Sequence, residues 1–171
     1  MTTYLALDFE TANHARDSAC ALGIAVVAGG DIVEETSFLV RPPSREFLFT
    51  CIHGLEWRHV QDAPTFGELW PRLNPYLEEA DFFVAHNAPF DMGVLAGCCE
   101  TYRLAPVRRP SVCTVRVARE VWGIYPTKLP DVCRHLGIGL KHHDAASDAS
   151  ACAGILVRAL GAGWRVPGSG G

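Results

Sequence analysis

The chain has 171 residues, 49% of them hydrophobic and 20% charged, and this size and composition indicate one globular domain with a core of its own. The formal net charge of −4 argues mildly against a nucleic-acid partner, because nucleic-acid binders are usually basic, although metal ions bound by several acids would weaken that argument. No apolar run approaches the length of a membrane span and no signal peptide precedes the first apolar run, so we expect a cytoplasmic protein without a membrane partner.

The seven cysteines support the same compartment. Their number is odd and no C-x-x-C pair occurs, so we expect neither a disulfide framework nor a cysteine zinc site. Most stand in apolar surroundings, which is typical of small core residues in a reducing environment.

The first third of the chain predicts three strands. An apolar run from Tyr4 to Phe9 indicates a buried strand. A polar loop over Asn13–Ser18 follows, and Ala19–Ala28 is again apolar and strand-like. Gly29 and Gly30 form a tight hairpin signal, and Ile32–Val40 is the return strand. We therefore expect an antiparallel meander.

The middle of the chain is harder to assign. Residues 44–64 are irregular and rich in aromatic side chains, and long loops of this kind are more often functional than not. A helix is predicted to begin at Pro64–Thr65, because apolar residues then recur at helical spacing. Pro71 and Pro75 lie within it, so we expect this helix to be short or kinked.

The second half alternates strands and helices. Phe82–Ala85 predicts a buried strand, and a short fifth strand is expected to end at Val112. Helices are predicted over Pro89–Tyr102, Val115–Val121, Leu129–Leu136 and Ala145–Leu160. The predicted fold class is α/β, a mixed five-stranded sheet flanked by helices. Residues 1–160 would form the domain, and residues 161–171 a flexible Gly-rich tail.

Two carboxylates interrupt the end of the first strand. Asp8 and Glu10 are two residues apart, so on a strand both project to the same face. Burying two like charges side by side is costly unless a cation neutralises them. Oxygen ligands suit hard divalent ions such as Mg²⁺ or Mn²⁺. The pair therefore predicts a metal site.

Two further acids lie on helix faces that should be buried. Apolar residues follow Asp91 at offsets of three, four, seven and eleven, and follow Asp148 at four, seven and eleven. Taken alone, Asp91 is better explained as a helix-start residue that interacts with the helix dipole. The coincidence of four inward-facing carboxylates favours a shared metal centre.

His143 precedes Asp148 by five residues at a predicted loop-to-helix junction. Histidine titrates near neutral pH, so His143 is a candidate for proton transfer beside the acids. We expect its neighbour His142 to be a surface residue. Four acids that bind two divalent ions, with a histidine that takes a proton from the attacking water, are a solution for phosphodiester hydrolysis.

These residues resemble a known family. Asp8-Phe9-Glu10-Thr11, the segment from His86 to Asp91, and His143-x-Ala145-x-x-Asp148 are similar to the three motifs of the DEDD superfamily, His subtype, in the same order. Proofreading epsilon subunits, ribonuclease T and oligoribonuclease belong to this superfamily. The resemblance implies a ribonuclease H-like fold and a 3′–5′ exonuclease that releases nucleoside monophosphates from single-stranded ends, with DNA favoured.

The resemblance also implies roles for individual residues. Asp8, Glu10, Asp91 and Asp148 would hold two Mg²⁺ or Mn²⁺ ions, and His143 would be the general base. The predicted substrate contacts are Phe9, Thr11, His53, Gly54, Leu55, Asn87 and Phe90. Phe90 could equally be a core residue.

Other readings stay open at this stage. The substrate could be RNA, or the chain could be a nucleic-acid-binding module associated with a polymerase. Cys113-Thr114 stands where many members have Asp-Thr, and no tethering domain follows residue 160, which favours a stand-alone nuclease. A homodimer is possible. One group of arginines could then serve a partner's substrate, could form a phosphate-facing patch, or could equally be a solvated surface: Arg103, Arg108, Arg109, Arg116 and Arg119.

Overall fold

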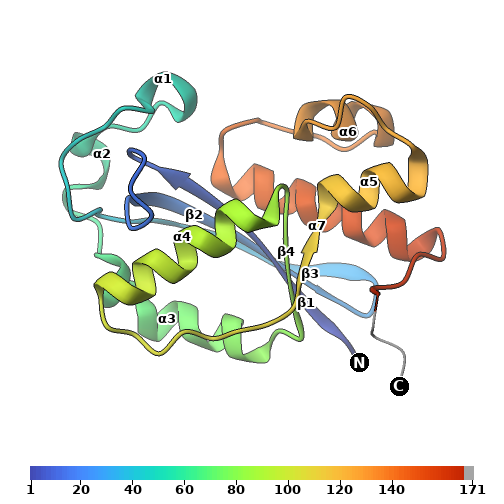
Figure 1. Cartoon of the computed structure of the whole chain (residues 1–171), viewed down its shortest axis with the longest axis horizontal. Coiled ribbons are helices and arrows are strands. Elements are labelled where there is room, and N and C mark those ends of the chain that lie inside the picture. The colour runs from blue at the N-terminus through green and yellow to red at the C-terminus, as the bar shows by residue number, and fades with distance from the viewer. Residues whose placement is uncertain (168–171) are drawn as a thin grey trace.

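The computed structural model describes residues 1–167 as three layers, with a five-stranded sheet between two layers of helices (Figure 1). The strands are β1 (Thr3–Thr11), β2 (Ala19–Ala28), β3 (Asp31–Leu39), β4 (Phe82–Ala85) and β5 (Ser111–Cys113). Their order across the sheet is β3-β2-β1-β4-β5. The first three strands form the predicted antiparallel meander. Strand β4 pairs parallel with β1, and β5 pairs parallel with β4. The predicted mixed α/β sheet is confirmed.

The helices are α1 (Thr50–His53), α2 (Trp57–Val60), α3 (Phe66–Glu79), α4 (Ala88–Thr101), α5 (Thr114–Trp122), α6 (Leu129–Leu136) and α7 (Ala145–Gly161). The five longer helices, α3 to α7, divide between the two faces of the sheet. The side chains of α3 and α4 share one apolar cluster with the sheet, and those of α5, α6 and α7 share another. Both faces of the central strand are therefore covered.

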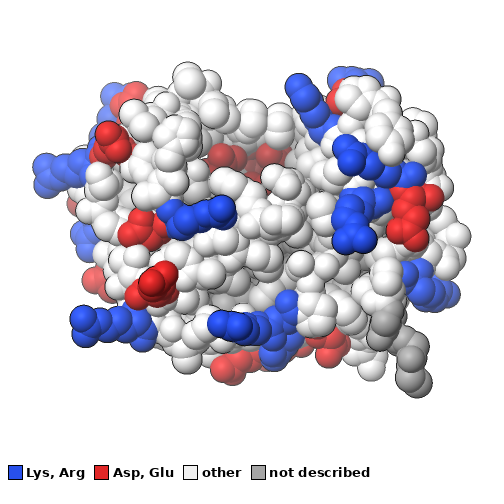
Figure 2. Space-filling model, viewed as in Figure 1, with Lys and Arg blue, Asp and Glu red and all other residues white. Residues whose placement is uncertain are grey.

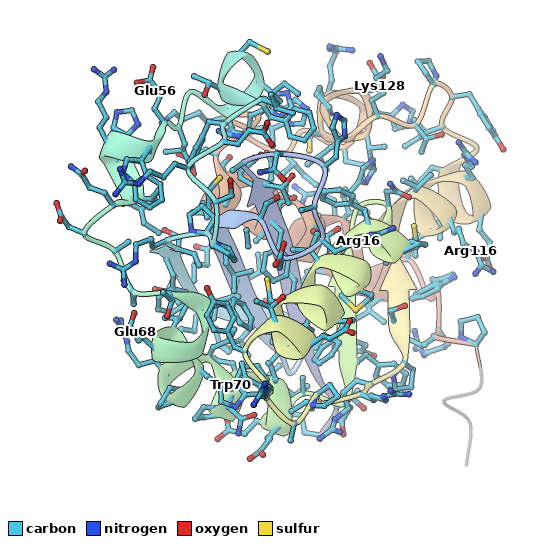
Figure 3. The ribbon with its side chains drawn as sticks, turned by 60° about the vertical axis from the view of Figure 1, so that its left-hand side comes forward. Arg16, Glu56, Glu68, Trp70, Arg116 and Lys128 are labelled. Carbon is cyan, nitrogen blue, oxygen red and sulfur yellow. The ribbon has the colours of Figure 1, made fainter. Side chains whose placement is uncertain are left out.

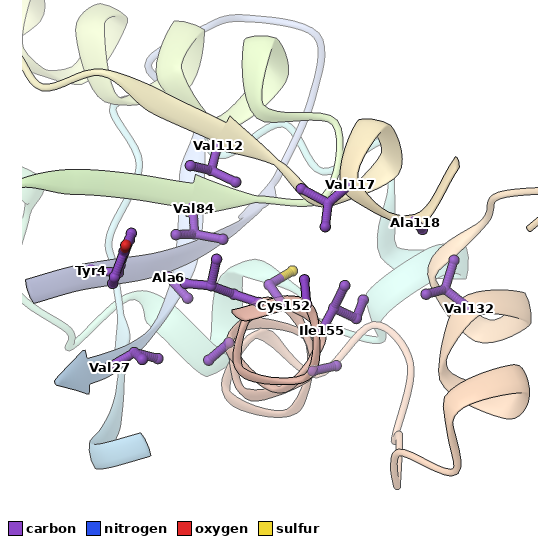
Figure 4. Close-up of a cluster of buried hydrophobic side chains, with 14 of the residues drawn as sticks. Tyr4, Ala6, Val27, Val84, Val112, Val117, Ala118, Val132, Cys152 and Ile155 are labelled. Carbon is purple, nitrogen blue, oxygen red and sulfur yellow. The ribbon is translucent and has the colours of Figure 1, made fainter. Parts of the chain in front are cut away.

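Alternation along β1 assigns its side chains to these two clusters. Leu5 and Leu7 lie in the cluster with α3 and α4, whereas Tyr4 and Ala6 lie in the cluster with α7 (Figure 4). Because side chains on a strand alternate between faces, Asp8 projects to the α7 side. The metal-ligand candidate on β1 thus faces the helix that carries Asp148.

Helix α3 departs from the prediction. It spans 14 residues, with Pro71 and Pro75 inside, so the expectation of a short helix is wrong. Thr65 and Glu68 form a capping box at its start, which satisfies two backbone amides. Its buried face consists of Phe66, Leu69, Leu73 and Leu77. Their burial offsets the hydrogen bonds that the two prolines remove.

The segment predicted as irregular, residues 44–64, contains the two short helices α1 and α2. Five of the seven cysteines are buried and all are free, as expected for core residues.

The predicted boundary at residue 160 lies inside packed structure. Helix α7 runs to Gly161, Trp164 packs against the α7-side cluster, and Val166 is buried. Residues 161–167 of the predicted tail are thus part of the packed domain, because apolar side chains anchor them. Residues 168–171 of that tail lie outside the described residues. Among residues 1–167, no helix is long and apolar enough to cross a membrane.

Candidate active site

Three of the predicted acids meet at the end of β1. Carboxylate oxygens of Asp8, Glu10 and Asp148 all lie within 4.8 Å of one another. Asp148 belongs to the first turn of α7, whose start is capped by the side chain of Asp144 accepting from Ser147 N–H at 3.2 Å. The acids border a cleft of about 320 Å³. Figure 2 shows acidic side chains at the bottom of a hollow, with Lys and Arg on the surrounding surface.

The fourth acid, Asp91, approaches the same place from α4 on the other side of the sheet. It is 3% exposed, and its Oδ1 accepts a hydrogen bond of 3.0 Å from the backbone N–H of Phe9, the residue between the two strand acids. Asn87, in the left-handed conformation with φ of 71°, begins the helix, with Pro89 in the first turn. The alternative of a mere helix-start acid does not account for this burial or this contact.

The pKa values of the four acids show that their negative charges are costly in this site. Burial raises the pKa of Glu10 to about 7 and that of Asp91 to about 7. Burial, with the neighbouring carboxylates, raises the pKa of Asp8 well above its usual value, and burial also raises that of Asp148. Four acids at neutral pH are therefore stable together only if protons or cations compensate their charge.

Asp148 gives the sharpest test of whether a cation fits. Its Oδ2 accepts hydrogen bonds from His142 and from the backbone of His143. Its Oδ1 is buried and has no hydrogen-bond partner among the described residues. A buried oxygen without a donor is costly. An all-oxygen donor set with one orphaned oxygen fits a hard divalent ion.

Two histidines precede α7. His142 is exposed, as expected of a surface residue, but it also contacts the site: its Nδ1 lies 2.9 Å from Asp148 Oδ2, and its ring stacks on that of His143 with centroids 3.7 Å apart. The sequence pattern did not reveal this contact, because it depends on how the loop turns back toward Asp148. His143 has a positive φ of 66° and an exposed ring. Partial burial and the neighbouring His142 lower its pKa, which favours the neutral, proton-accepting form.

His53 connects the segment around α1 to the end of β1. We call this segment, residues 44–56, the α1 loop. Its Nδ1 accepts the backbone N–H of Leu55 at 3.0 Å, so its Nε2 carries the proton and donates to the carbonyl of Thr11 at 3.1 Å. Gly54 has φ of +76°, a left-handed conformation that glycine adopts without strain. Both ring nitrogens are thus used within the protein, and the ring borders the cleft.

The remaining predicted contacts differ in exposure. Phe9 is buried and packs near Phe66, with ring centroids 6.4 Å apart, so it is a core residue that also lines the cleft. Thr11 is buried, and Asn87 is exposed. Phe90 is 42% exposed and lines the cleft, so the alternative of a core Phe90 is wrong.

His86, the first residue of the motif segment that ends at Asp91, is hydrogen-bonded to two later parts of the chain. His86 Nδ1 lies 2.8 Å from Thr114 Oγ1, and its Nε2 lies 2.9 Å from the carbonyl of Thr127. These bonds join the end of β4 to the start of α5. In the segment Cys113-Thr114, the residue that matches the family pattern, Thr114, thus makes a hydrogen bond to His86.

Two arginines of the predicted patch form hydrogen bonds within the protein. Arg109 donates to the carbonyls of Ala80 and Glu78 at the end of α3, at 2.6 and 2.9 Å. Arg119 donates to Thr127 Oγ1 at 2.9 Å and lies over the ring of Tyr125. These two guanidinium groups stabilise loops, which leaves fewer free cations in this region than the sequence suggested.

The mixed sheet, its flanking helices and the carboxylates at the end of its central strand define a protein of the ribonuclease H-like exonuclease class. A profile of the exonuclease family (RNase_T) matches residues 5–156. The chain therefore belongs to this exonuclease family.

Known proteins resemble the chain in sequence and in fold. The DNA polymerase III PolC-type of Thermotoga maritima is 30% identical over 161 residues, which cover 91% of this chain but 12% of that protein. The chain thus spans about a tenth of the length of the curated relatives it matches.

Solved structures share the fold. Exonuclease X in complex with 5′-overhanging duplex DNA superposes with a TM-score of 0.76 at 23% identity, covering 96% of this chain and 95% of that one. The nuclease domain of 3′hExo, a DEDDh family member bound to rAMP, gives a TM-score of 0.76 at 18% identity, covering 94% and 92%.

Proposed function

We propose that this domain is a metal-dependent 3′–5′ exonuclease that removes nucleoside 5′-monophosphates from single-stranded ends, with DNA as the favoured substrate. The observation that carries the proposal is the group of four acids Asp8, Glu10, Asp91 and Asp148. The last three are buried, and the pKa values of all four are raised. Asp148 Oδ1 has no hydrogen-bond partner among residues 1–167. DEDDh nucleases generally use divalent metals.

In this proposal the four acids hold two Mg²⁺ or Mn²⁺ ions. Bound there, the ions would supply Lewis-acid chemistry, activating water and stabilising the charge that develops on the leaving oxygen. Asp148 and Asp91 are held rigidly by hydrogen bonds to the backbone of His143 and Phe9. Such fixed ligands reduce the reorganisation that the reaction needs.

His143 would accept the proton of the attacking water. Its exposed ring borders the cleft, and its lowered pKa keeps it neutral near pH 7. Phe90, Asn87 and the α1 loop with Gly54 and Leu55 would surround the terminal nucleotide, while Thr11 would contact it through its backbone or hydroxyl.

DNA is favoured because the sequence relatives are DNA polymerases and exonuclease X is solved with DNA. RNA is the second candidate, because another protein of the same fold is a 3′-exonuclease that recognises the histone mRNA stem-loop. Because the PolC relatives are DNA polymerases, we also propose that this domain works with a polymerase, either in the same chain or as a separate partner. A homodimer remains a further proposal.

A gel assay tests the function directly. Single-stranded DNA and RNA of equal sequence, labelled at the 5′ end, are incubated with Mg²⁺, Mn²⁺ or EDTA, beside an Asp8→Ala control. We expect a metal-dependent ladder that shortens from the 3′ end, faster on DNA, and no ladder with Asp8→Ala. A faster ladder on RNA would select the second candidate. An equally active Asp8→Ala protein, or no shortening with any metal, would refute the nuclease assignment.

A further inference from the structure

One stripe of α4 begins at the active site and runs away from it. Phe90, Gly93, Gly97 and Thr101 follow one another at intervals of three and four residues, so they share one side of the helix. We call them the outer stripe of α4. Phe90 lines the cleft, so this stripe begins at the cleft, and whatever lies on the stripe lies just outside the cleft.

The loop between β1 and β2 lies on the outer stripe of α4. Thr101 Oγ1 donates to Asp17 Oδ2 at 2.9 Å. A Cβ at Gly97 would lie 2.5 Å from Cβ of Arg16, and a Cβ at Gly93 would lie 1.8 Å from its Nη1. The Arg16 side chain therefore begins beside Gly97 and extends to Gly93, one turn nearer the cleft. Figure 3 shows Arg16 beside this helix.

Buried polar side chains hold the backbone of the loop that carries Arg16. Ser18 is 1% exposed, and its Oγ donates to the carbonyl of Ala15 at 2.7 Å. Asn13 is 5% exposed, and its Nδ2 donates to the carbonyl of Glu46 at 3.0 Å. These bonds satisfy the backbone of a tight loop and fix its conformation.

The guanidinium of Arg16, by contrast, has no partner. It is exposed and forms no hydrogen bond or ion pair with any residue in 1–167. The glycines at 93 and 97 let it lie against the helix, which reduces the freedom it would lose on binding. A pre-positioned guanidinium presents a fork of donors that matches phosphate oxygens.

We propose that Arg16 binds a backbone phosphate of the substrate strand, upstream of the scissile bond, where the strand passes over Phe90. This rests on the proposed function, because it requires a nucleic-acid strand in the cleft. The formal net charge of the chain is −4, so a cation just outside the cleft favours the binding of a polyanionic strand.

The test compares a long and a short substrate. A single-stranded oligonucleotide has upstream phosphates that can reach Arg16. By contrast, p-nitrophenyl thymidine 5′-phosphate has only the phosphodiester at the reaction site, so it cannot reach Arg16. We expect Arg16→Gln to lower the ratio of kcat/KM on the oligonucleotide to that on the small ester about tenfold. The slope of log KM against log salt should fall by about 0.7, the value for one phosphate of a single strand. Arg16→Lys should recover part of the ratio.

Two further variants separate position from charge. Gly93→Ala keeps the charge and displaces the guanidinium tip, and alanine favours the helix, so the fold is maintained. It should lower the ratio as Arg16→Gln does. Arg165→Gln removes the same charge near Tyr4, at the opposite end of β1 from the acids, and should not lower it.

The outcomes distinguish the two proposals. If the unaltered protein hydrolyses neither substrate, the proposed function fails and the Arg16 proposal fails with it. If it hydrolyses the oligonucleotide while Arg16→Gln and Gly93→Ala keep its ratio and salt slope, the role of Arg16 is overturned and the nuclease assignment stands.

Discussion

Gly23 of β2 lies against Ala145, the first residue of α7, so closely that a Cβ at position 23 would lie 1.8 Å from the Ala145 carbonyl oxygen. Gly23 is also the register partner of Asp8 in the β1–β2 ladder. The missing side chain thus lets the start of α7 approach the strand pair that carries Asp8. Asp148, one turn into α7, is brought to Asp8 by this contact.

Replacement of Gly23 with Ala should therefore damage both stability and the site. Backbone must move to accept the methyl group, which costs about 1–3 kcal/mol of unfolding free energy and separates Asp148 from Asp8. Thermal unfolding and Mn²⁺ binding by titration calorimetry measure the two effects. Gly139→Ala is the control, because a Cβ there meets nothing within 4 Å. A Gly23→Ala protein as stable and metal-binding as this control would contradict the argument.

Metal removal should make stability depend on pH. The pKa values of Glu10 and Asp91 rise on folding from 4.5 and 3.8 to about 7. Between those limits the native state holds more protons than the unfolded state, so stability falls as pH rises. In EDTA we expect Tm to decline from about pH 4 to pH 7 and then level off.

Added Mg²⁺ or Mn²⁺ should raise Tm most above pH 7, where the acids are ionised. Asp8→Asn, which removes one repelling charge, should raise Tm in EDTA at pH 8 and weaken the response to metal. Scanning calorimetry at several pH values measures both effects. A metal-free Tm that increases through this pH range would show that the acids do not dominate the stability of the site.

The two histidines before α7 should differ in effect. His143→Ala removes the proposed base and should lower kcat about 10²-fold or more with metal affinity retained. In the unaltered protein, kcat/KM should rise with pH with a midpoint below the usual histidine pKa of 6.5, because the pKa of His143 is lowered.

His142→Ala should instead weaken metal binding, because it frees Asp148 Oδ2 from its 2.9 Å bond, and reduce kcat by about tenfold or less. Exposed His135 provides the control. Steady-state kinetics combined with Mn²⁺ titration separate the two roles. Equal losses of kcat in both variants would argue against His143 as the base.

The sequence was sufficient to place a side chain where its direction follows from the local periodicity of a strand or helix. Two-residue spacing placed Asp8 and Glu10 on one face of a strand, and helical spacing placed Asp91 and Asp148 inward. It was insufficient where contacts join distant segments. The bond between His142 and Asp148 depends on how a loop folds back, and the place of Arg16 depends on two glycines some 80 residues further along.

Local rules also misjudged the length of α3. Its two prolines predicted a short or kinked helix, yet buried apolar side chains on one face sustain a helix of 14 residues. Tertiary packing overrode propensity there. At the end of the chain, apolar Trp164 and Val166 outweigh the neighbouring glycines, and the packed structure extends beyond the predicted boundary.

His53 should act through the α1 loop. Its Nε2–H holds the Thr11 carbonyl at the end of β1, and its Nδ1 holds Leu55 N–H. His53→Ala breaks both bonds, so the loop should open more often, limited proteolysis within residues 44–56 should become faster, and KM for an oligonucleotide should rise several-fold. His59→Ala is a matched control, because His59 Nδ1 also accepts a backbone N–H, that of Glu56 at 2.9 Å, but without a bond to β1. If both variants are cleaved at the same rate and keep the same KM, the bond to Thr11 does not hold the loop, and the contribution of His53 must come from its ring face in the cleft.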